Sequence, residues 1–544
     1  MKNSKIEIRN SIEARNPKFE FEATELPQVL RRTPSLRYSE DSGLLATFRI
    51  SSLIRISSLK IRISPLLFLC VLCVSAVKCS AQNAPRPNIL FAIADDATWQ
   101  HFSAYGCRFC NTPNFDRVAR EGALFMNAFT PLPKCSPSRA SILTGKYPWQ
   151  LEEACDHYGV FPSKFKVFPD MLESAGYFVG YTGKGWGPGN WKKGGFTRNP
   201  AGNQFADVNL IPPTTGINKL DYASNFKIFL DAKPKDKPFC FWYGGFEPHR
   251  AYERDSGVKA GKKLEDVTVP PYLPDDPIVR GDLLDYAREI EWFDHHLGLM
   301  LDELLKRGEI DKTIIVVTAD NGMPFPRDKG HIYEDACHLP LAIRWPGIVA
   351  PGTKIDDFVS FVDIAPTFVD IAGAQSTAMS GKSLINVLRG TSSARDHVIL
   401  GREREDVGRP NDEGYPVRGV RTKDFFYTRN FKPDRWPAGN PETGYTDIDN
   451  SPTKTLIVER KDKFHDLALA KRGPEELYDL RSDPSCVKNV SDDPQYAQIK
   501  AKLWEQLKTE LTEQQDPRIV GDGDVFDHYK STAPRGRAWE NRKN

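Results

Sequence analysis

Residues 88–94 read Asn-Ile-Leu-Phe-Ala-Ile-Ala and run straight into two aspartates, while residues 313–319 read Thr-Ile-Ile-Val-Val-Thr-Ala and run into Asp-Asn-Gly. Neither stretch alternates polar with apolar residues. Continuous apolar runs of this length are typical of strands buried on both faces, as in a parallel sheet covered by helices. The two runs therefore predict buried strands of a parallel sheet in an α/β domain.

Helix-like stretches lie between and after these runs, at 114–121, 166–175 and 281–307, where apolar residues recur at spacings of three and four. The alternation predicts a large domain with a central, mostly parallel sheet flanked by helices. Ligands of open α/β sheets collect beyond the carboxyl ends of the strands. The polar residues that follow the two runs occupy such ends: Asp95, Asp96, Asp320 and Asn321.

The pattern of the sequence changes near residue 395. Short β-like runs at 397–401 and 424–430 are followed by a Pro/Gly/Asp-rich stretch at 432–453 and a helical pattern at 494–514. We expect one catalytic domain over 85–395. A smaller α+β domain with a polar tail should follow over 396–544.

An apolar segment at 65–77 is preceded by basic residues and followed by Cys79-Ser80-Ala81. This order is that of a secretory signal, and the segment is too short to span a bilayer. We expect a signal peptide over 59–81, export to the periplasm or beyond the cell, and no stable membrane span. The polar residues 1–58 are expected to be an unstructured or mis-assigned extension.

Charge and cysteine content limit the classes of function. Lys+Arg 74 nearly balance Asp+Glu 72, so no global field favours nucleic acid or an anionic membrane. Seven cysteines remain beyond the leader, an odd number that leaves one unpaired or chemically special. Cys107 and Cys110 form a lone C-x-x-C pair, which suggests a local disulfide or two free thiols.

Cys135 begins the segment Cys-Ser-Pro-Ser-Arg-Ala-Ser-Ile-Leu-Thr-Gly. Ser136 suits an N-cap, Pro137 the first helical position and Gly145 the C-terminal stop, so Cys135 is predicted at the mouth of a short helix. First-turn amides attract anions, and Arg139 adds a cation. These residues alone indicate a reactive cysteine in an anion pocket.

The pattern Cys-x-Pro-Ser-Arg followed by a small residue, Ser and a Leu-Thr-Gly ending resembles the signature of type I, formylglycine-dependent sulfatases. The resemblance extends over roughly 86–500, from Asn88-Ile89-Leu90 to Glu476-Leu477-Tyr478-Asp479-Leu480. It implies an alkaline-phosphatase/sulfatase-like fold. It also implies that a formylglycine-generating maturation enzyme converts Cys135 to 3-oxoalanine (formylglycine).

The resemblance further implies roles for individual residues. One Ca²⁺, or Mg²⁺, would be held by oxygen ligands. Its implied ligands are Asp95, Asp96, Asp320, Asn321 and the formylglycine at Cys135. The residues implied to act on the sulfate and the leaving group are Cys135, Arg139, Lys184, His249 and Lys329. In the implied mechanism a formylglycine gem-diol attacks sulfur, and His249 or Lys329 protonates the leaving group.

One departure from the family pattern concerns Trp186. Sulfatases commonly carry Gly-Lys-x-His, whereas this chain has Gly183-Lys184-Gly185-Trp186. The missing histidine puts part of the mechanism in doubt. The candidates to replace it are His157, His331 and His338.

The stretches at 320–326 and 416–421 resemble the heparan N-sulfatase (sulfamidase) branch. They favour a sulfated amino sugar or related glycan as the substrate. Two other readings stay open: a phosphoester or phosphonate hydrolase of the same superfold, and a non-catalytic protein that binds sulfated glycan.

Overall fold

The computed structural model describes residues 86–391 and 395–534. The expected extension at 1–58 and signal peptide at 59–81 lie outside the described residues. The described residues belong to one compact unit. Among the described helices, none is both long enough and apolar enough to cross a membrane. The seven described cysteines are free thiols, Cys107 and Cys110 included.

An eight-stranded sheet forms the centre of the fold, in the order β4-β3-β5-β1-β6-β7-β2-β8. Every pairing is parallel except those of β7, which runs against both of its neighbours. The expectation of a mostly parallel sheet is confirmed. The strands are β1 (Asn88–Ala94), β2 (Ala123–Phe129), β3 (Phe178–Gly183), β4 (Asn203–Gln204), β5 (Phe239–Gly244), β6 (Thr313–Ala319), β7 (Leu341–Arg344) and β8 (Thr353–Ser360).

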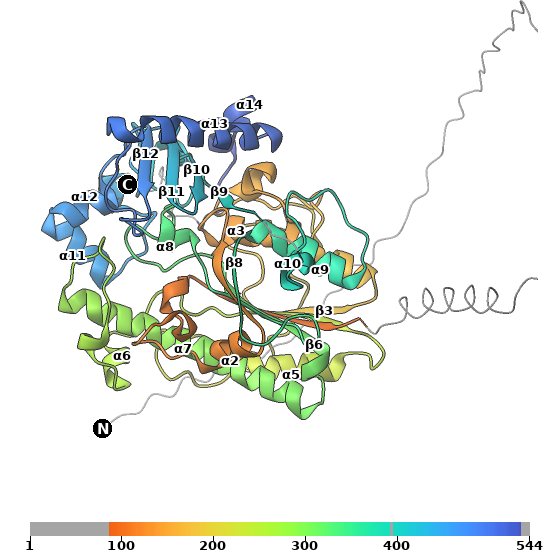
Figure 1. Ribbon diagram of the computed structural model, residues 1–544. Helices are drawn as coiled ribbons and strands as arrows, with labels where there is room; N and C mark the ends of the chain where they lie inside the picture. Colours follow the sequence, from red (N-terminus) through yellow and green to blue (C-terminus); the bar gives the residue numbers. More distant parts are fainter. Residues whose placement is uncertain (1–85, 392–394, 535–544) are drawn as a thin grey trace, which may run out of the picture. The chain divides into compact units, whose positions relative to one another are not determined.

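Helices cover both faces of this sheet (Figure 1). On β1, Leu90 and Ala92 point into the core shared with α2, α5 and α7, whereas Ile89 and Phe91 point into the core shared with α3, α4 and α9. Burial on both faces explains why the strand sequence does not alternate. The helices named are α2 (Pro113–Glu121), α3 (Cys135–Thr144), α4 (Phe168–Ser174), α5 (Tyr222–Ala232), α7 (Pro277–Lys306) and α9 (Ile364–Ala372).

Helix α7 begins four residues before the predicted stretch. The Asp276 side chain accepts a hydrogen bond from the amide of Ile278, and Pro277 occupies the first turn. A capped start of this kind satisfies amides that have no partner within the helix. Apolar spacing does not reveal such a start, because it lies before the buried face begins.

A second, antiparallel sheet of order β12-β11-β10-β9 begins at His397. It consists of β9 (His397–Arg402), β10 (Val417–Thr422), β11 (Phe425–Asn430) and β12 (Glu475–Asp479). Helix α13 (Ala497–Glu513) packs on it through Leu503, Leu507 and Leu511, spaced by four. A smaller α+β part is thus present, while the domain boundary at 395 stays a prediction.

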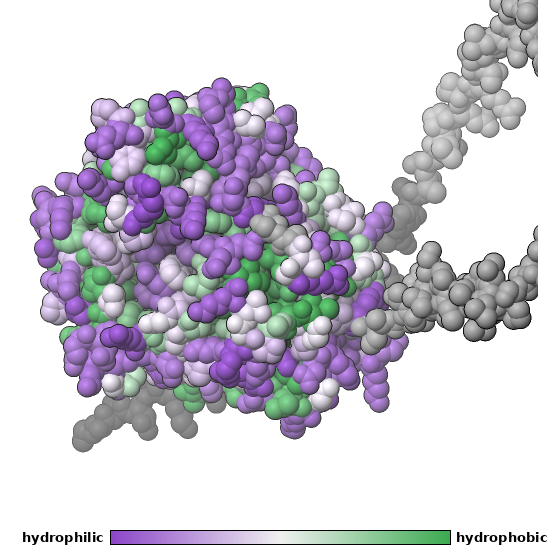
Figure 2. Space-filling model, in the orientation of Figure 1, coloured by the Kyte–Doolittle hydropathy of each residue, from purple (hydrophilic) through white to green (hydrophobic). Residues whose placement is uncertain are grey.

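Short helices complete the described chain: α6 (Ser256–Lys259), α8 (Glu334–Cys337), α10 (Ile385–Leu388), α11 (Pro452–Arg460), α12 (Lys463–Leu469), α14 (Pro517–Val520) and α15 (Val525–His528). Figure 2 shows hydrophilic side chains over most of one face, with small apolar groups among them.

Candidate active site

The site is built at the carboxyl edge of the central sheet. Ala94 and Ala319 are register partners on the parallel strands β1 and β6, so the polar residues after each strand emerge side by side. The amide of Asp96 donates to Oδ1 of Asp320 at 3.0 Å. Nδ2 of Asn321 donates to Oδ1 of Asp96 at 2.8 Å. The two predicted polar pairs therefore form one buried cluster.

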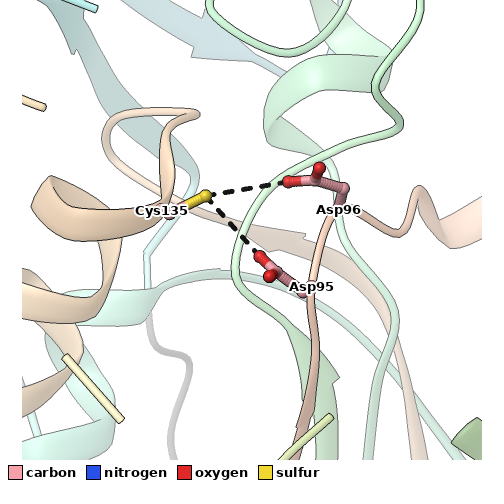
Figure 3. A group of neighbouring side chains, drawn as sticks. All are labelled: Asp95, Asp96 and Cys135. Carbon is pink, nitrogen blue, oxygen red and sulfur yellow. Dashed lines mark hydrogen bonds between the residues drawn. The ribbon is translucent and has the colours of Figure 1, made fainter. Parts of the chain in front are cut away.

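Helix α3 brings Cys135 to the same cluster. Its Sγ points at the two aspartates of β1, 3.6 Å from Oδ1 of Asp95 and 3.9 Å from Oδ1 of Asp96 (Figure 3). Burial raises the pKa of the Cys135 thiol, and the neighbouring Lys184 does not offset this. Burial of an unmodified Cys135 thus favours the thiol over the thiolate.

The predicted N-cap of this helix is wrong by two residues. Ser136 lies inside α3, which begins at Cys135 with Lys134 at the cap position. The reason is a hydrogen bond of 3.0 Å from the Ser138 amide to the Lys134 carbonyl, which closes a helical turn around Cys135. Gly145 ends the helix in a left-handed conformation as predicted.

Arg139 ties the cysteine helix to the strand ends. Its Nε lies 2.8 Å from Oδ2 of Asp320, and its Nη1 donates to the carbonyls of Lys184 and Gly185 at 2.8 and 3.1 Å. Its Nη2 lies 3.6 Å from Oδ1 of Asp95. The guanidinium is fully buried, so these contacts fix its plane.

Each of two lysines forms an ion pair with one of the two aspartates that follow β1. Nζ of Lys184 lies 2.8 and 2.6 Å from the two carboxylate oxygens of Asp95. Nζ of Lys329 lies 2.6 Å from Oδ2 of Asp96. Burial alone would lower the pKa of each lysine, but the paired carboxylates outweigh it and the pKa values are raised. Both lysines are cationic at pH 7.

His249 completes the set of predicted residues at the cluster. Its Nε2 lies 3.9 Å from Oδ2 of Asp96, and its Nδ1 lies 2.6 Å from the Arg250 carbonyl. The side chain is 36% exposed, whereas Asp96 is fully buried. The His249 side chain is therefore more exposed than those of Asp96, Lys184 and Lys329.

The cluster opens into a cleft of about 500 Å³. Asp95, Lys184 and His249 line it, together with the loop at Gly187 and Pro188. Cys135 and Arg139 lie beneath, almost completely buried. A ligand can thus place an anionic group against the cluster while the rest of it occupies the cleft.

The residues predicted as metal ligands fit a hard divalent cation. Asp95, Asp96, Asp320 and Asn321 offer only oxygen donors in this arrangement. Oδ1 of Asn321 is buried and has no hydrogen-bond partner among the described residues, so it is available as a ligand. One ligand atom each of Cys135, Asp95 and Asp96 lie within 4.8 Å of one another, close enough to bind the same metal ion.

Trp186 lies beside the cysteine helix, not in the cleft. Its Nε1 donates to the Ser136 carbonyl at 2.9 Å, and its ring lies 5.0 Å from that of Phe161. The indole is 3% exposed. A buried tryptophan therefore packs at the position where the family pattern has a polar histidine.

The three candidate replacement histidines lie in buried surroundings of their own. His157 pairs with Asp406 at 3.4 Å, and His338 contacts Glu334 and the Met126 carbonyl. Neither ring nitrogen of His331 has a hydrogen-bond partner among the described residues. Burial lowers the pKa of His157 to about 4 and that of His338 as well. These surroundings give none of the three a direct place at Cys135.

Sequence reasoning missed two acidic residues near the cluster. Oδ2 of Asp449 lies 2.9 Å from Nζ of Lys329, and Oδ2 of Asp406 lies 3.1 Å from Nζ of the buried Lys134. Burial raises the pKa of Asp449, but Lys329, Lys134 and His249 outweigh it and hold the pKa well below its usual range. The only signal for Asp449 was its place in a Pro/Gly/Asp-rich stretch.

An α/β sheet whose carboxyl edge presents carboxylates, fixed cations and a buried cysteine forms a site suited to a cation and an anionic group. The sulfatase family model matches residues 87–374, and the model described as N-sulphoglucosamine sulphohydrolase, C-terminal, matches 325–428. The first match spans more than half of the chain. The chain belongs to the sulfatase family.

Known proteins resemble this chain over most of its length. An ulvan-active sulfatase of Formosa agariphila is 29% identical over 491 residues, 86% of this chain and 91% of that protein. Human N-sulphoglucosamine sulphohydrolase is 28% identical over 497 residues, 82% of this chain and 94% of that protein.

Two solved structures share the fold. One, a complex with its substrate D-glucosamine-2-N,6-O-disulfate, has a TM-score of 0.57, is 22% identical, and covers 80% of this chain and all of its own. The phosphonate monoester hydrolase of Agrobacterium radiobacter has a TM-score of 0.55, is 19% identical, and covers 80% of this chain and 97% of its own.

Proposed function

We propose that this sulfatase hydrolyses a sulfate ester or sulfamate on a carbohydrate, with a sulfated amino sugar favoured, and that it uses formylglycine made from Cys135 and one divalent cation. The observation that carries the proposal is the position of Cys135. It lies against Asp95 and Asp96, with Arg139 and Lys184 around the same carboxylates. The likeness to human N-sulphoglucosamine sulphohydrolase supports the choice of sugar.

The fixed cations suit a sulfate group. Arg139, Lys184 and Lys329 hold their positions through buried ion pairs, so they need little reorganisation when negative charge grows on the sulfuryl oxygens. Formylglycine, when formed, would supply a hydrated aldehyde as the nucleophile, and a cation held by the four oxygen donors would supply Lewis-acid chemistry.

The proton for the leaving group would come from the open side of the cluster. His249 lines the cleft, and Lys329 lies on the same carboxylate, Asp96. Both side chains can donate a proton through nitrogen. We assign the proton donor to this pair, with His249 favoured because it lines the cleft and is the more exposed of the two.

Two expectations about the cellular setting belong to the proposal. A formylglycine-generating enzyme would act on Cys135 before the chain folds, since the thiol is 1% exposed in the folded protein. Export, to the periplasm or outside the cell, follows from the signal-like segment at 59–81.

The test uses protein purified from its own host. Mass spectrometry of the peptide containing Cys135 should show formylglycine, and sulfate should be released from N-sulfated or O-sulfated glucosamine. A Cys135→Ser protein from the same host is the control and should release about a hundredth as much or less. An unmodified thiol together with no sulfate release would refute the proposal.

The same purified protein also tests the two alternative functions. The fold is shared with a phosphonate monoester hydrolase, so phosphate monoesters and phosphonate esters should be assayed beside the sulfated sugars. A kcat/KM higher for those substrates would replace the sulfatase assignment. Tight binding of sulfated glycan without turnover of any ester would favour the non-catalytic reading.

A further inference from the structure

Asp449 places an additional carboxylate beside the predicted proton donors. Its Oδ2 lies 2.9 Å from Nζ of Lys329, which also contacts Asp96 at 2.6 Å. One ligand atom each of Asp96, His249 and Asp449 lie within 4.8 Å of one another. The loop before α11 thus brings an anion to a site whose substrate is itself anionic.

The segment that carries Asp449 is rigidly held. The buried carboxylate of Asp447 binds Arg402 at 2.8 Å and Arg409 at 2.7 Å. Nζ of Lys454 donates to the Ile448 carbonyl at 2.8 Å, before Asp449, and to Oδ1 of Asn450 at 3.1 Å, after it. Because both sides of the residue are anchored, the Asp449 carboxylate has a defined position at the cluster.

Asp449 is one of the more exposed members of the cluster. Cys135, Arg139 and Asp96 are at most 1% exposed, so they surround the sulfate end. The more exposed members are His249, at 36%, and Asp449, at 26%. A carboxylate repels a sulfate, so at this position it contributes nothing to holding that group. Besides its ion pair with Lys329, the carboxylate can act on the atom that leaves.

The two kinds of substrate differ in the charge of that atom. An ester reacts as R–O–SO3⁻ + H2O → R–OH + HSO4⁻, and its leaving oxygen ends neutral. A sulfamate reacts as R–NH–SO3⁻ + H2O → R–NH3⁺ + SO4²⁻, because the S–N bond breaks and the freed amine takes a second proton at neutral pH. Only the second reaction creates a cation on the sugar side.

We propose that Asp449 is a specificity-determining residue that favours a nitrogen-linked sulfate, by accepting hydrogen bonds from the leaving amine as it becomes an ammonium. This inference rests on the proposed function. A hydrogen bond from an ammonium to a carboxylate is among the strong ones in proteins, and a hydroxyl gains much less from the same partner.

The kinetic test compares Asp449→Asn with the wild-type enzyme on N-sulfoglucosamine and on glucosamine 6-sulfate. We expect kcat/KM for the N-sulfate to fall about tenfold or more, and kcat/KM for the 6-sulfate to change about twofold at most. Asp449→Glu, which keeps the carboxylate, should retain part of the nitrogen preference. Glu442→Gln removes an exposed charge from the same segment and should behave as wild type.

Binding of the sugar product supplies a readout that needs no turnover. In Cys135→Ser protein at pH 6.5, calorimetry should show glucosamine, an ammonium, binding more tightly than the neutral N-acetylglucosamine. Adding Asp449→Asn should remove that difference. The comparison within Cys135→Ser protein also stands if the Asp449→Asn variant fails to fold.

The outcomes separate the two claims. Equal losses on both substrates, an oxygen preference in the wild-type enzyme, or no preference for glucosamine in the binding test would overturn the role of Asp449 and leave the sulfatase proposal intact. Failure of the wild-type enzyme to release sulfate from either sugar would overturn the proposed function, and the binding test would then decide on Asp449.

Discussion

The backbone amide of Asp96 donates a hydrogen bond of 3.0 Å to the side chain of Asp320, 224 residues away in the chain. The bond joins the residues that follow β1 and β6, two strands that pair with each other along their whole length. A carboxylate fixed by a backbone donor cannot turn freely. The oxygen cluster is therefore largely formed before any cation binds.

Addition of Ca²⁺ or Mg²⁺ should raise the melting temperature of protein freed of metal by a chelator. A cation at one hundred times its Kd contributes about 2.7 kcal/mol to the free energy of unfolding. Asn321→Ala removes the buried Oδ1 that has no partner among the described residues, and should weaken the response. Differential scanning calorimetry measures it.

The matched control for this experiment is Asn203→Ala, on the exposed strand β4. It should keep the full response to the cation. Equal stabilisation of the Asn321→Ala protein, or no stabilisation of the wild type, would speak against a metal held by these residues.

Arg139→Ala should destabilise the fold by about 3–5 kcal/mol, because it leaves the buried Asp320 carboxylate without its cation. Burial raises the pKa of Asp320, and Arg139 is the main group that opposes this. Urea denaturation gives the free energy of unfolding. Arg120→Ala, an exposed change on α2, should stay within about 0.5 kcal/mol of wild type, and a similar value for Arg139→Ala would contradict the prediction.

The centre of the fold could be predicted because local sequence and burial agree there. Both predicted strands of the central sheet have the bounds of β1 and β6, since every one of their residues is buried. Strand β10 was not predicted. Its Arg418 is fully buried through pairs with Glu403 and Asp516, partners whose positions the local sequence does not reveal.

In the candidate site, too, some residues could be predicted from the local sequence and others could not. The residues that follow strands, or that belong to the family pattern, were predicted and meet at one cluster. Asp449 was not, because its role depends on Lys329, 120 residues earlier in the chain. Tertiary ion pairs of this kind have no local periodicity or spacing from which they can be inferred.

Stability should fall as the pH rises from about 5 to 8 through Glu405. Its side chain is fully buried, and neither carboxylate oxygen has a hydrogen-bond partner within the described chain. Burial raises its pKa to about 8, although Arg402 and Lys134 oppose the change. In this pH range the folded protein keeps a proton that the unfolded chain releases, so each rise in pH favours unfolding.

Glu405→Gln removes this titration and should stabilise the protein relative to wild type more at pH 8.5 than at pH 5. The measurement is the melting temperature of both proteins across this range. Glu403→Gln is not a suitable control, because Glu403 pairs with Arg418 and Arg518. Exposed Glu513→Gln is suitable and should leave the pH profile unchanged. A constant difference between Glu405→Gln and wild type would contradict the assigned pKa.

Trp186→His should not restore a family-like site, although it returns the usual residue to the Gly-Lys-x-His position. The indole lies in an apolar pocket with Phe161 and donates to the Ser136 carbonyl, next to Cys135. A smaller, polar imidazole would leave space unfilled, which should cost about 2 kcal/mol or more. Trp186→Phe keeps one aromatic ring but loses the indole N–H and some buried volume, which should cost about 1–2 kcal/mol.

Sulfate release and urea denaturation of both variants test this account. We expect lower stability for Trp186→His, with kcat equal to or below that of wild type. Trp191→His, on the half-buried part of the same loop, should cost less. A rise in kcat for Trp186→His would mean that the position still faces the reacting atoms. The indole instead donates a hydrogen bond to the helix that carries Cys135, so we expect Trp186 to act by positioning the cysteine. Proton transfer must then depend on other groups of the cluster.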